Sequence, residues 1–386
     1  MSTNQSPLVS SPVKCPVCNT VTPQITTKTG AYRVNAKDTD FRPSEVIWTN
    51  PDFQKHDPLQ FFMASCPKCF YTHEYTNEFK AWESDFSFVT YTRAAVAQKH
   101  LTAFQDKNGV IQFVGPCIDT EKYPTESAIL KLILGIHNEL LLTQPSALNV
   151  ARFFLRIAWL FRGGDAQSTN ADSTTDPMAR FRREIATVSA IVKSYGDAVK
   201  TLQSTIESIN ASTSDLARAE ELARKKNEVL AQLSAPLPPL AQSASAFANL
   251  CEGSENGVAA ASNGQGYYSF GDFQEFLVQA KQRFPETPTN EQEALAKASV
   301  YYINAFERGS QVKDGLAQVQ AAYLIAEISR RAGDFATADR YFVATMKIGR
   351  ELVHDEKANA ASTNQTEKLL ATAMEQARLS KQQQQA

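Results

Sequence analysis

The sequence has no excess of either charge, since 39 Lys and Arg residues stand against 41 Asp and Glu residues in a chain of 386. Its first hundred residues are similarly balanced, with ten basic and nine acidic side chains. Proteins that bind nucleic acid or anionic lipid usually carry a basic surface that attracts phosphate groups. We therefore expect proteins or small molecules as partners, and not nucleic acid.

An apolar run long enough to cross a membrane is also lacking. The most apolar stretch, residues 128–142, is interrupted by Lys131, His137, Asn138 and Glu139 and is shorter than the roughly 20 residues that span a bilayer. The opening residues, MSTNQSPLVSSPVK, do not combine a basic segment with an apolar one, as a secretory signal would. We expect a cytoplasmic protein without a membrane span, in which residues 128–142 form a buried helix.

The patterns of common catalytic sites are missing as well. The sequence contains no P-loop, no G-x-S-x-G, no H-E-x-x-H and no G-x-G-x-x-G. An enzyme is therefore the weaker hypothesis, and we assign no catalytic or organic-cofactor-binding residue. The candidates an enzyme would use are Asp38 and Asp40 in KDTDFRP, with His56 or His73 nearby. For the two aspartates, hydrogen bonding to the local backbone in a turn is the favoured interpretation.

Cysteine is scarce, yet four of the six cysteines occur in two C-P-x-C pairs. These are Cys15, Cys18, Cys66 and Cys69. Four thiolates at this spacing form a tetrahedral site without an open position, for which zinc is the usual occupant. We predict one structural Zn²⁺ per chain, with a redox-active dithiol or disulfide as the alternative. Cys117 and Cys251 stand alone and receive no role, and His56 and His73 are not needed as ligands.

The N-terminal part differs in composition from the rest. Residues 1–95 are rich in turn formers, β-branched residues and aromatic residues, so we expect a small zinc-ribbon-like β domain that packs on other parts of the chain. Residues 96–177 change to the period of amphipathic helices and are expected to form the first helices of an array. Gly163 and Gly164 are expected to end one of these helices.

Residues 178–235 carry apolar side chains at alternating spacings of three and four, which is typical of a heptad seam. The simplest interpretation is an inserted, coiled-coil-like helical hairpin with both arms in one chain. Pairing of the seam between chains, which would make a homo-oligomer, is the alternative. Residues 236–266 have no periodicity and are expected to form a linker.

Residues 267–355 contain successive amphipathic stretches, and AAYLIAEISRRAGDFATADRYFVATMKI has the pattern of a tetratricopeptide repeat. In this interpretation Gly333 and Asp334 turn the chain between two helices, and small residues such as Ala326 let the helices approach. Ordinary packing of a helix bundle is the alternative. We expect a terminal helix and a polar tail in residues 356–386.

Several motifs together resemble one bacterial family. They are CPVC, YRVNAKDTDFRP, NPDF, CPKCFYTHEY, FFLRIAWLFR and GDF. In this order they resemble the family known as domain of unknown function 2225, over residues 13–165 and again over about 290–350. The resemblance implies that the four paired cysteines are metal ligands, followed by tetratricopeptide-like helices, and it implies no activity. The sequence departs from the family at Phe70, where glycine is usual, which puts the shape of the second cysteine turn in question. Residues 178–266 look like an insertion.

These features predict an α+β fold that is mainly α, in which a zinc-ribbon-like unit packs on a tetratricopeptide-like helical array with an inserted hairpin. The leading hypothesis is an intracellular scaffold or adaptor without catalytic activity that binds a protein partner through the array or the hairpin. The alternatives are a zinc-ribbon protein that binds nucleic acid or regulates, and an enzyme that uses Asp38 and Asp40.

Overall fold

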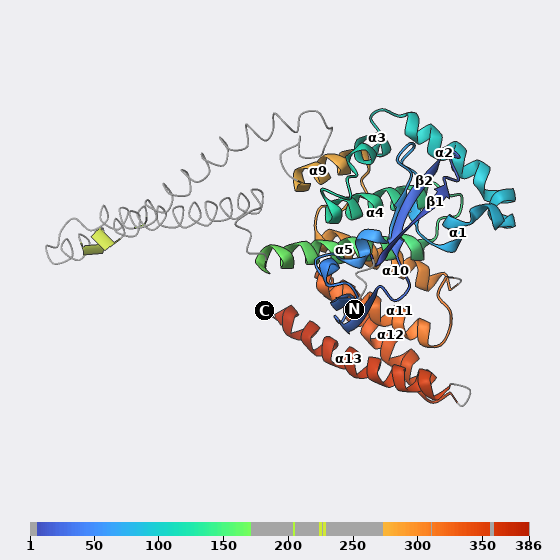
Figure 1. Cartoon of the computed structure of the whole chain (residues 1–386). Helices are drawn as coiled ribbons and strands as arrows, with labels where there is room; N and C mark the ends of the chain where they lie inside the picture. Colours follow the sequence, from blue (N-terminus) through green and yellow to red (C-terminus); the bar gives the residue numbers. More distant parts are fainter. Residues whose placement is uncertain are drawn as a thin grey trace, which may run out of the picture. The chain divides into compact units, whose positions relative to one another are not determined.

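The computed structural model describes residues 6–170, 204, 224–225, 227–228, 273–309, 311–355 and 359–385. The chain divides into two compact units, of which the first joins residues 1–165 to residues 265–386 and the second comprises residues 166–264. The predicted hairpin at 178–235, apart from isolated positions, and the predicted linker at 236–266 lie outside the described residues. The following description concerns the first unit (Figure 1).

Three antiparallel hairpins form the N-terminal part of this unit, and each is a separate two-stranded sheet. Their strands are β1 (Leu8–Lys14) with β2 (Val21–Thr27), β3 (Tyr32–Lys37) with β4 (Pro43–Trp48), and β5 (Met63–Ser65) with β6 (Thr72–Glu74). The C-P-x-C pairs connect β1 to β2 and β5 to β6, while the KDTDFRP segment connects β3 to β4. An isolated two-stranded hairpin is at best marginally stable, so each one depends on cross-linking or on packing against helices.

Helices follow the strands. They are α1 (Asn77–Lys80), α2 (Arg93–Gln105), α3 (Val110–Val114), α4 (Pro124–Leu140) and α5 (Ala147–Asn170). Short 3₁₀ segments and one π-helical turn lie among them, at Pro51–Phe53, Pro58–Phe61, Trp82–Ser84, Gly115–Cys117 and Phe88–Thr92. Helix α4 confirms the buried helix predicted at residues 128–142, and Leu130, Ile133 and Leu134 have no exposed surface. In the described part of the chain, no helix is both long and apolar enough to cross a membrane.

The prediction that a helix ends at Gly163 and Gly164 is wrong, because α5 continues through both glycines to Asn170. The structure gives another reason for glycine at position 163. A Cβ atom there would lie 2.9 Å from the guanidinium nitrogen Nη2 of Arg42, so the missing side chain lets the β3–β4 hairpin approach the helix closely. A single helical glycine is tolerated when such packing offsets its cost of about 1 kcal/mol.

The C-terminal helices of this unit are α9 (Phe273–Arg283), α10 (Glu291–Glu307), α11 (Leu316–Ala332), α12 (Phe335–Val353) and α13 (Ala360–Gln385). Helices α10, α11, α12 and α13 contact one another in sequence order. The predicted turn between α11 and α12 is present: Gly333 is left-handed with φ of 85°, and the Asp334 carboxylate accepts a hydrogen bond from the N–H of Thr337 at 3.1 Å. Ala326 and Ala338 are fully buried where the two helices pack.

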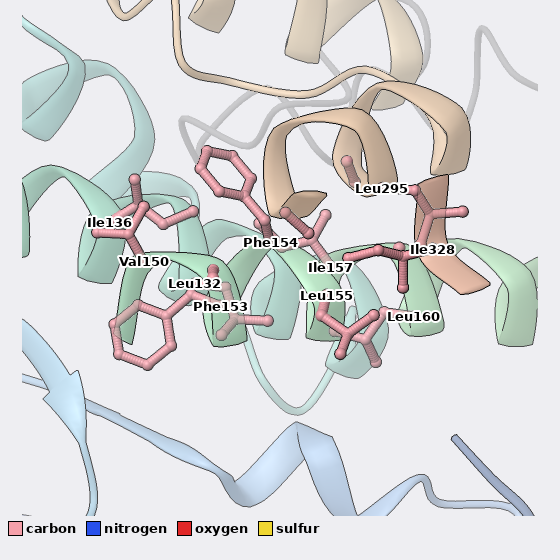
Figure 2. Packing of buried hydrophobic residues seen from close by; sticks show 14 of the residues in the cluster. Leu132, Ile136, Val150, Phe153, Phe154, Leu155, Ile157, Leu160, Leu295 and Ile328 are labelled. Atoms are coloured by element: carbon pink, nitrogen blue, oxygen red, sulfur yellow. The ribbon is translucent and has the colours of Figure 1, made fainter. Parts of the chain in front are cut away.

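One continuous hydrophobic core joins the two ends of the sequence in this unit. Figure 2 shows side chains of α4 and α5 meeting those of α10 and α11. The labelled residues are Leu132, Ile136, Val150, Phe153, Phe154, Leu155, Ile157, Leu160, Leu295 and Ile328. Each fully buried side chain of this kind stabilises the fold by about 1.5–3 kcal/mol. Helices separated by more than a hundred residues therefore form one body.

Candidate metal centre

The two C-P-x-C segments share one backbone geometry. In the first knuckle, residues 15–20, the N–H of Cys15 donates to the carbonyl of Thr20 at 2.9 Å and the N–H of Asn19 donates to the carbonyl of Cys15 at 3.0 Å. The second knuckle, residues 66–71, repeats both bonds at the equivalent positions, at 2.9 and 2.8 Å. In each hairpin the strand residue just before the knuckle pairs with the residue just after it. The sequence therefore builds the same turn twice.

The four cysteine sulfurs of these knuckles meet in one cluster, as their spacing predicted. Their Sγ atoms all lie within 4.8 Å of one another, with 3.7 Å between Cys15 and Cys69 and 3.5 Å between Cys18 and Cys66. Sulfurs about 2.3 Å from a tetrahedral zinc ion would be about 3.8 Å apart, whereas a disulfide requires about 2.05 Å. The four cysteines are free thiols in a geometry that is compatible with one metal ion.

Burial and mutual hydrogen bonding shape the chemistry of the cluster. Cys15, Cys66 and Cys69 are only 2–3% exposed, and Cys18 is partly buried. Hydrogen bonds from the thiols of Cys15 and Cys69 hold the pKa of Cys66 well below its ordinary value. Hydrogen bonding to Cys66 raises the pKa of Cys15 to about 12, and bonding to Cys15 raises that of Cys69. The thiols therefore titrate as one interacting group, whose negative charge a bound cation would neutralise.

The first knuckle is held by side chains that follow the strands. Trp82 donates from its indole Nε1 to the carbonyl of Lys14 at 2.7 Å. Arg93, at the start of α2, donates to the carbonyl of Pro16 at 2.9 Å and to the Asn19 side chain at 2.7 Å. Its guanidinium carbon also lies 4.6 Å from the centre of the Trp82 ring, which is a cation–π contact. Trp82 is buried, at 5% exposed, whereas Arg93 is partly exposed.

The second knuckle is instead held by buried polar side chains of two helices. His100 of α2 is 1% exposed, and its Nε2 lies 2.9 Å from the carbonyl oxygen of Cys69. Its Nδ1 lies 2.9 Å from Oδ1 of Asn138 in α4, which in turn donates from its amide nitrogen to the carbonyl of Thr72 at 2.9 Å. Two backbone carbonyls of the second hairpin thus find their partners inside the helical body.

A family model matches residues 8–210 and 276–369, which is more than half of the chain. Its description is an uncharacterized protein conserved in bacteria (DUF2225). The chain belongs to the DUF2225 family. No curated protein and no solved structure matches it. The match is longer than the motifs suggested, because it includes residues 178–210, where we expected an insertion to begin, and omits residues 211–275.

Phe70 stands where the resemblance led us to expect glycine, yet the second knuckle has the same backbone shape as the first. Phe70 adopts a left-handed backbone with φ of 59°, and Asn19 at the equivalent position has φ of 60°. Such a backbone is unfavourable for a bulky residue. The Phe70 ring packs against Gly115, where an added Cβ would lie 2.2 Å from the ring, and it lies 6.1 Å from the ring of Phe104. This packing offsets the strain.

Asp38 and Asp40, the carboxylates considered for catalysis, form ion pairs with α5. Arg162 donates to both oxygens of Asp40, at 3.2 and 2.9 Å, and also pairs with Asp38 at 3.2 Å and with Glu291 of α10 at 2.6 Å. The indole of Trp159 donates to Asp40 at 3.1 Å. Burial alone would raise the pKa of Asp40, which is fully buried, but the hydrogen bonds and charge of Arg162 hold it below its ordinary value. Two motifs of the family resemblance, KDTDFRP and FFLRIAWLFR, are therefore in contact.

The same loop also reaches α11. The Tyr323 hydroxyl donates to the carbonyl of Thr39 at 2.8 Å, and the Thr39 hydroxyl donates to the buried carboxylate of Glu327 at 2.5 Å. Phe41 is left-handed, with φ of 66°, and its N–H donates to the carbonyl of Asp38 at 2.9 Å, which closes the turn. The KDTDFRP loop is thus fastened to two helices, α5 and α11, and Arg162 links it to Glu291 of α10.

The two histidines considered as catalytic candidates have separate partners. His56 lies 3.0 Å from the side-chain oxygen of Gln60 through its Nδ1. His73 lies 3.0 Å from the carbonyl of Glu74, and its ring stacks on Phe79 at 5.8 Å. Among the described residues, no hydrogen bond or ion pair joins either histidine to Asp38 or Asp40. Cys117 is buried apart from the cluster, and Cys251 lies outside the described residues.

Sequence reasoning missed His100, Asn138 and Arg162. His100 and Asn138 bond to backbone carbonyls, and because every residue has such a carbonyl, the sequence does not indicate these partners. Arg162 could have been found, because a charged residue in the apolar FFLRIAWLFR helix must have a partner. Its partners are 122 and 129 positions away in the chain, so that signal would not have named them.

Proposed function

We propose that this protein is an intracellular, zinc-stabilised scaffold that binds another protein through its helices and has no catalytic activity of its own. The observation that carries the proposal is the closed arrangement of Cys15, Cys18, Cys66 and Cys69. Four protein sulfurs supply every position of a tetrahedral ion, and three of them are almost fully buried. A catalytic zinc keeps one position open for water or substrate, whereas a closed site contributes folding free energy.

The helices supply the proposed binding surface. Arrays of paired helices, such as tetratricopeptide repeats, present an extended face to other proteins, and we propose this role for α10 to α13. Val300 of α10 and Val343 of α12 are 64% and 70% exposed, which provides apolar contacts on these helices. The hairpin predicted at residues 178–235 is a second surface in this proposal, for a partner or for another copy of the chain.

Contacts between the hairpins and the helices link the metal to this surface. The second knuckle bonds to His100 and Asn138, and the KDTDFRP loop bonds to Arg162 and Tyr323. A change at the cysteine cluster would therefore reach α2 and α4 through specific hydrogen bonds, and α4 shares its hydrophobic core with α10 and α11. In the proposed scaffold, zinc keeps the helical surface in its binding conformation.

The metal part of the proposal is tested by elemental analysis of the purified chain and of Cys66→Ser. We expect one zinc per wild-type chain and loss of that zinc in the variant, because four-sulfur sites without an open position typically bind zinc. Cys117→Ser is the matched control, since it removes a buried cysteine outside the cluster. Stoichiometric iron would identify the other metal that takes tetrahedral sulfur ligands. Metal-free protein with an intact fold would point instead to redox-active thiols.

The scaffold part is tested by crosslinking mass spectrometry on the full-length protein in cell extract. We expect crosslinks from a recurrent partner to map to α10–α13 or to residues 178–235, and to decrease after zinc is removed with a chelator. Crosslinks that avoid these regions, or no protein partner in repeated surveys, would contradict it. Binding of DNA or RNA at low salt would favour the nucleic-acid alternative.

A further inference from the structure

A cavity beside the second knuckle, lined in part by Pro67 and Phe70, has no role in the scaffold proposal. Its volume is about 820 Å³, and it is bounded by the β1–β2 hairpin, by the two 3₁₀ segments between Pro51 and Phe61, and by residues 115–131. Pockets for small organic molecules usually measure about 300–1,000 Å³. The cavity is therefore large enough for such a ligand.

Its walls are mostly apolar. Phe53, Phe61, Phe70, Met63 and Ile118 contribute side chains, and they come from segments spread over more than sixty residues of sequence. The position of Met63 is well defined, since its Cε atom occupies the space that a Cβ of Gly135 would fill, at 2.3 Å. A wall of this kind suits the hydrocarbon or aromatic part of a ligand.

Lys131 contributes a cation to this apolar wall. It lies on α4 one helical turn before Gly135, so both residues are on the face of the helix that packs against Met63. Within the described part of the chain, no carboxylate lies within 4.0 Å of the Lys131 ammonium and no hydrogen bond to it is found. Glu121 lines the same cavity without pairing with it.

An amine in this position is unusual. Burial alone lowers the pKa of Lys131 to about 8, and no neighbouring charge opposes that shift. An unpaired ammonium in an apolar environment is costly unless an anion or hydrogen-bond acceptors compensate it. Arg162 shows the contrast, because it has three carboxylate partners, at 2.6–3.2 Å.

A second polar group of the cavity is already ordered. His56 and Gln60 both line it, and the Gln60 amide bridges the His56 ring at 3.0 Å and the Thr125 hydroxyl at 3.2 Å. Gln60 is 6% exposed. The cavity thus combines an apolar wall, a fixed polar pair and one unpaired cation, which are the elements of a site for a ligand with one charged end.

We propose that this cavity binds a small organic anion with an apolar body, whose carboxylate pairs with the ammonium of Lys131. The apolar part lies against Phe53, Phe61 and Ile118. This role is independent of the proposed scaffold function, because no protein partner enters the argument. The ligand would stabilise the charge that the fold itself leaves unpaired.

Isothermal titration calorimetry on the full-length protein tests the proposal with three probes that share one apolar chain. They are octanoate, 1-octanol and octylamine. We expect wild-type protein to bind octanoate at least about tenfold more tightly than octanol, and octylamine least, because only the anion pairs with the lysine. Equal affinity for octanoate and octanol, or no octanoate binding at millimolar concentration, would overturn the proposal.

Two substitutions complete the experiment. Lys131→Met keeps the length and apolar stem of the side chain but removes its charge, and we expect it to bind octanoate at least about tenfold more weakly while binding octanol as wild type does. Lys347→Met removes an exposed lysine of α12 and should change neither affinity. Unfolding curves establish that both variants are folded. Octanoate binding to Lys131→Met with wild-type affinity would show that the cation is not part of the site.

Discussion

The first and second knuckles have the same backbone hydrogen bonds but differ in what holds them. The first closes a long hairpin with seven-residue strands, and its partners are the buried indole of Trp82 and the partly exposed Arg93. The second closes a hairpin with three-residue strands and is bonded to His100 and Asn138 inside the helical body. The difference predicts that a metal bound at the cluster would be the main attachment of the first knuckle and an additional one for the second.

The largest test of this comparison is removal of the metal. A structural zinc contributes roughly 10–16 kcal/mol, so a chelator should destabilise the cysteine cluster strongly. Hydrogen exchange measured by mass spectrometry should show that β1 and β2 lose protection first, whereas β5 and β6 retain part of theirs through Asn138. The β3–β4 hairpin, which Arg162 holds without metal, is the internal control. Simultaneous loss in all three hairpins would break the comparison.

The next largest effect is expected at the hairpin that has no cysteine. Arg162→Met leaves the carboxylates of Asp40, Asp38 and Glu291 without their common partner, and breaking a buried ion pair costs about 3–5 kcal/mol. Urea unfolding of the metal-loaded protein measures the loss. Lys281→Met, which breaks an exposed pair with Glu293, should cost less than about 1 kcal/mol.

For the second knuckle, Asn138→Ala isolates the buried attachment. It leaves the carbonyl of Thr72 and the Nδ1 atom of His100 without the Asn138 side chain as a partner, which should lower the free energy of unfolding by about 2–4 kcal/mol. The metal content should stay at the wild-type value, because the substitution removes no cysteine sulfur. An unchanged unfolding midpoint would show that the helices do not hold this knuckle.

Acid should act on the β3–β4 hairpin through Asp40. Because the pKa of Asp40 is lower in the folded than in the unfolded protein, its contribution to stability is complete above the unfolded value of about 3.9 and is lost as the pH falls through the folded value. Urea unfolding between pH 6 and pH 3 should therefore show a stability loss that is smaller in Arg162→Met, where Asp40 has lost its partner. Equal slopes in the two proteins would contradict the role of this pair.

The smallest effect is expected at the first knuckle. Arg93→Ala removes hydrogen bonds to Pro16 and Asn19 and the contact with Trp82, but water can replace them at this partly exposed position, so the cost should be about 1 kcal/mol. Thermal unfolding of the metal-loaded protein measures it. After chelation the same substitution should lower the free energy of unfolding by more, because Arg93 is then one of the few remaining attachments of the first knuckle. A loss equal to that of Asn138→Ala would remove the distinction between the knuckles.

The sequence predicted the features that are encoded locally. The cysteine cluster follows from spacing and residue type, the turn at Gly333 from its glycine and the capping Asp334, and α4 from its apolar period. What it could not predict depends on approach between distant segments. From the sequence alone, Gly163 predicts the end of a helix, because the close approach of Arg42 is not visible there. Likewise, the sequence shows Lys131 only as a charged residue within an apolar run, and it does not show the cavity beside it.

The separation of the two knuckles in the chain also affects synthesis. The cysteines of the first pair leave the ribosome 51 residues before those of the second. At about 5–20 residues per second, two thiols stay exposed for roughly 2.5–10 s with only half of the cysteine cluster. Asn138, which fastens the second knuckle, emerges later still. In a living cell, nascent chains of this protein would therefore pass through a stage in which Cys15 and Cys18 can react with oxidants or take up the wrong metal.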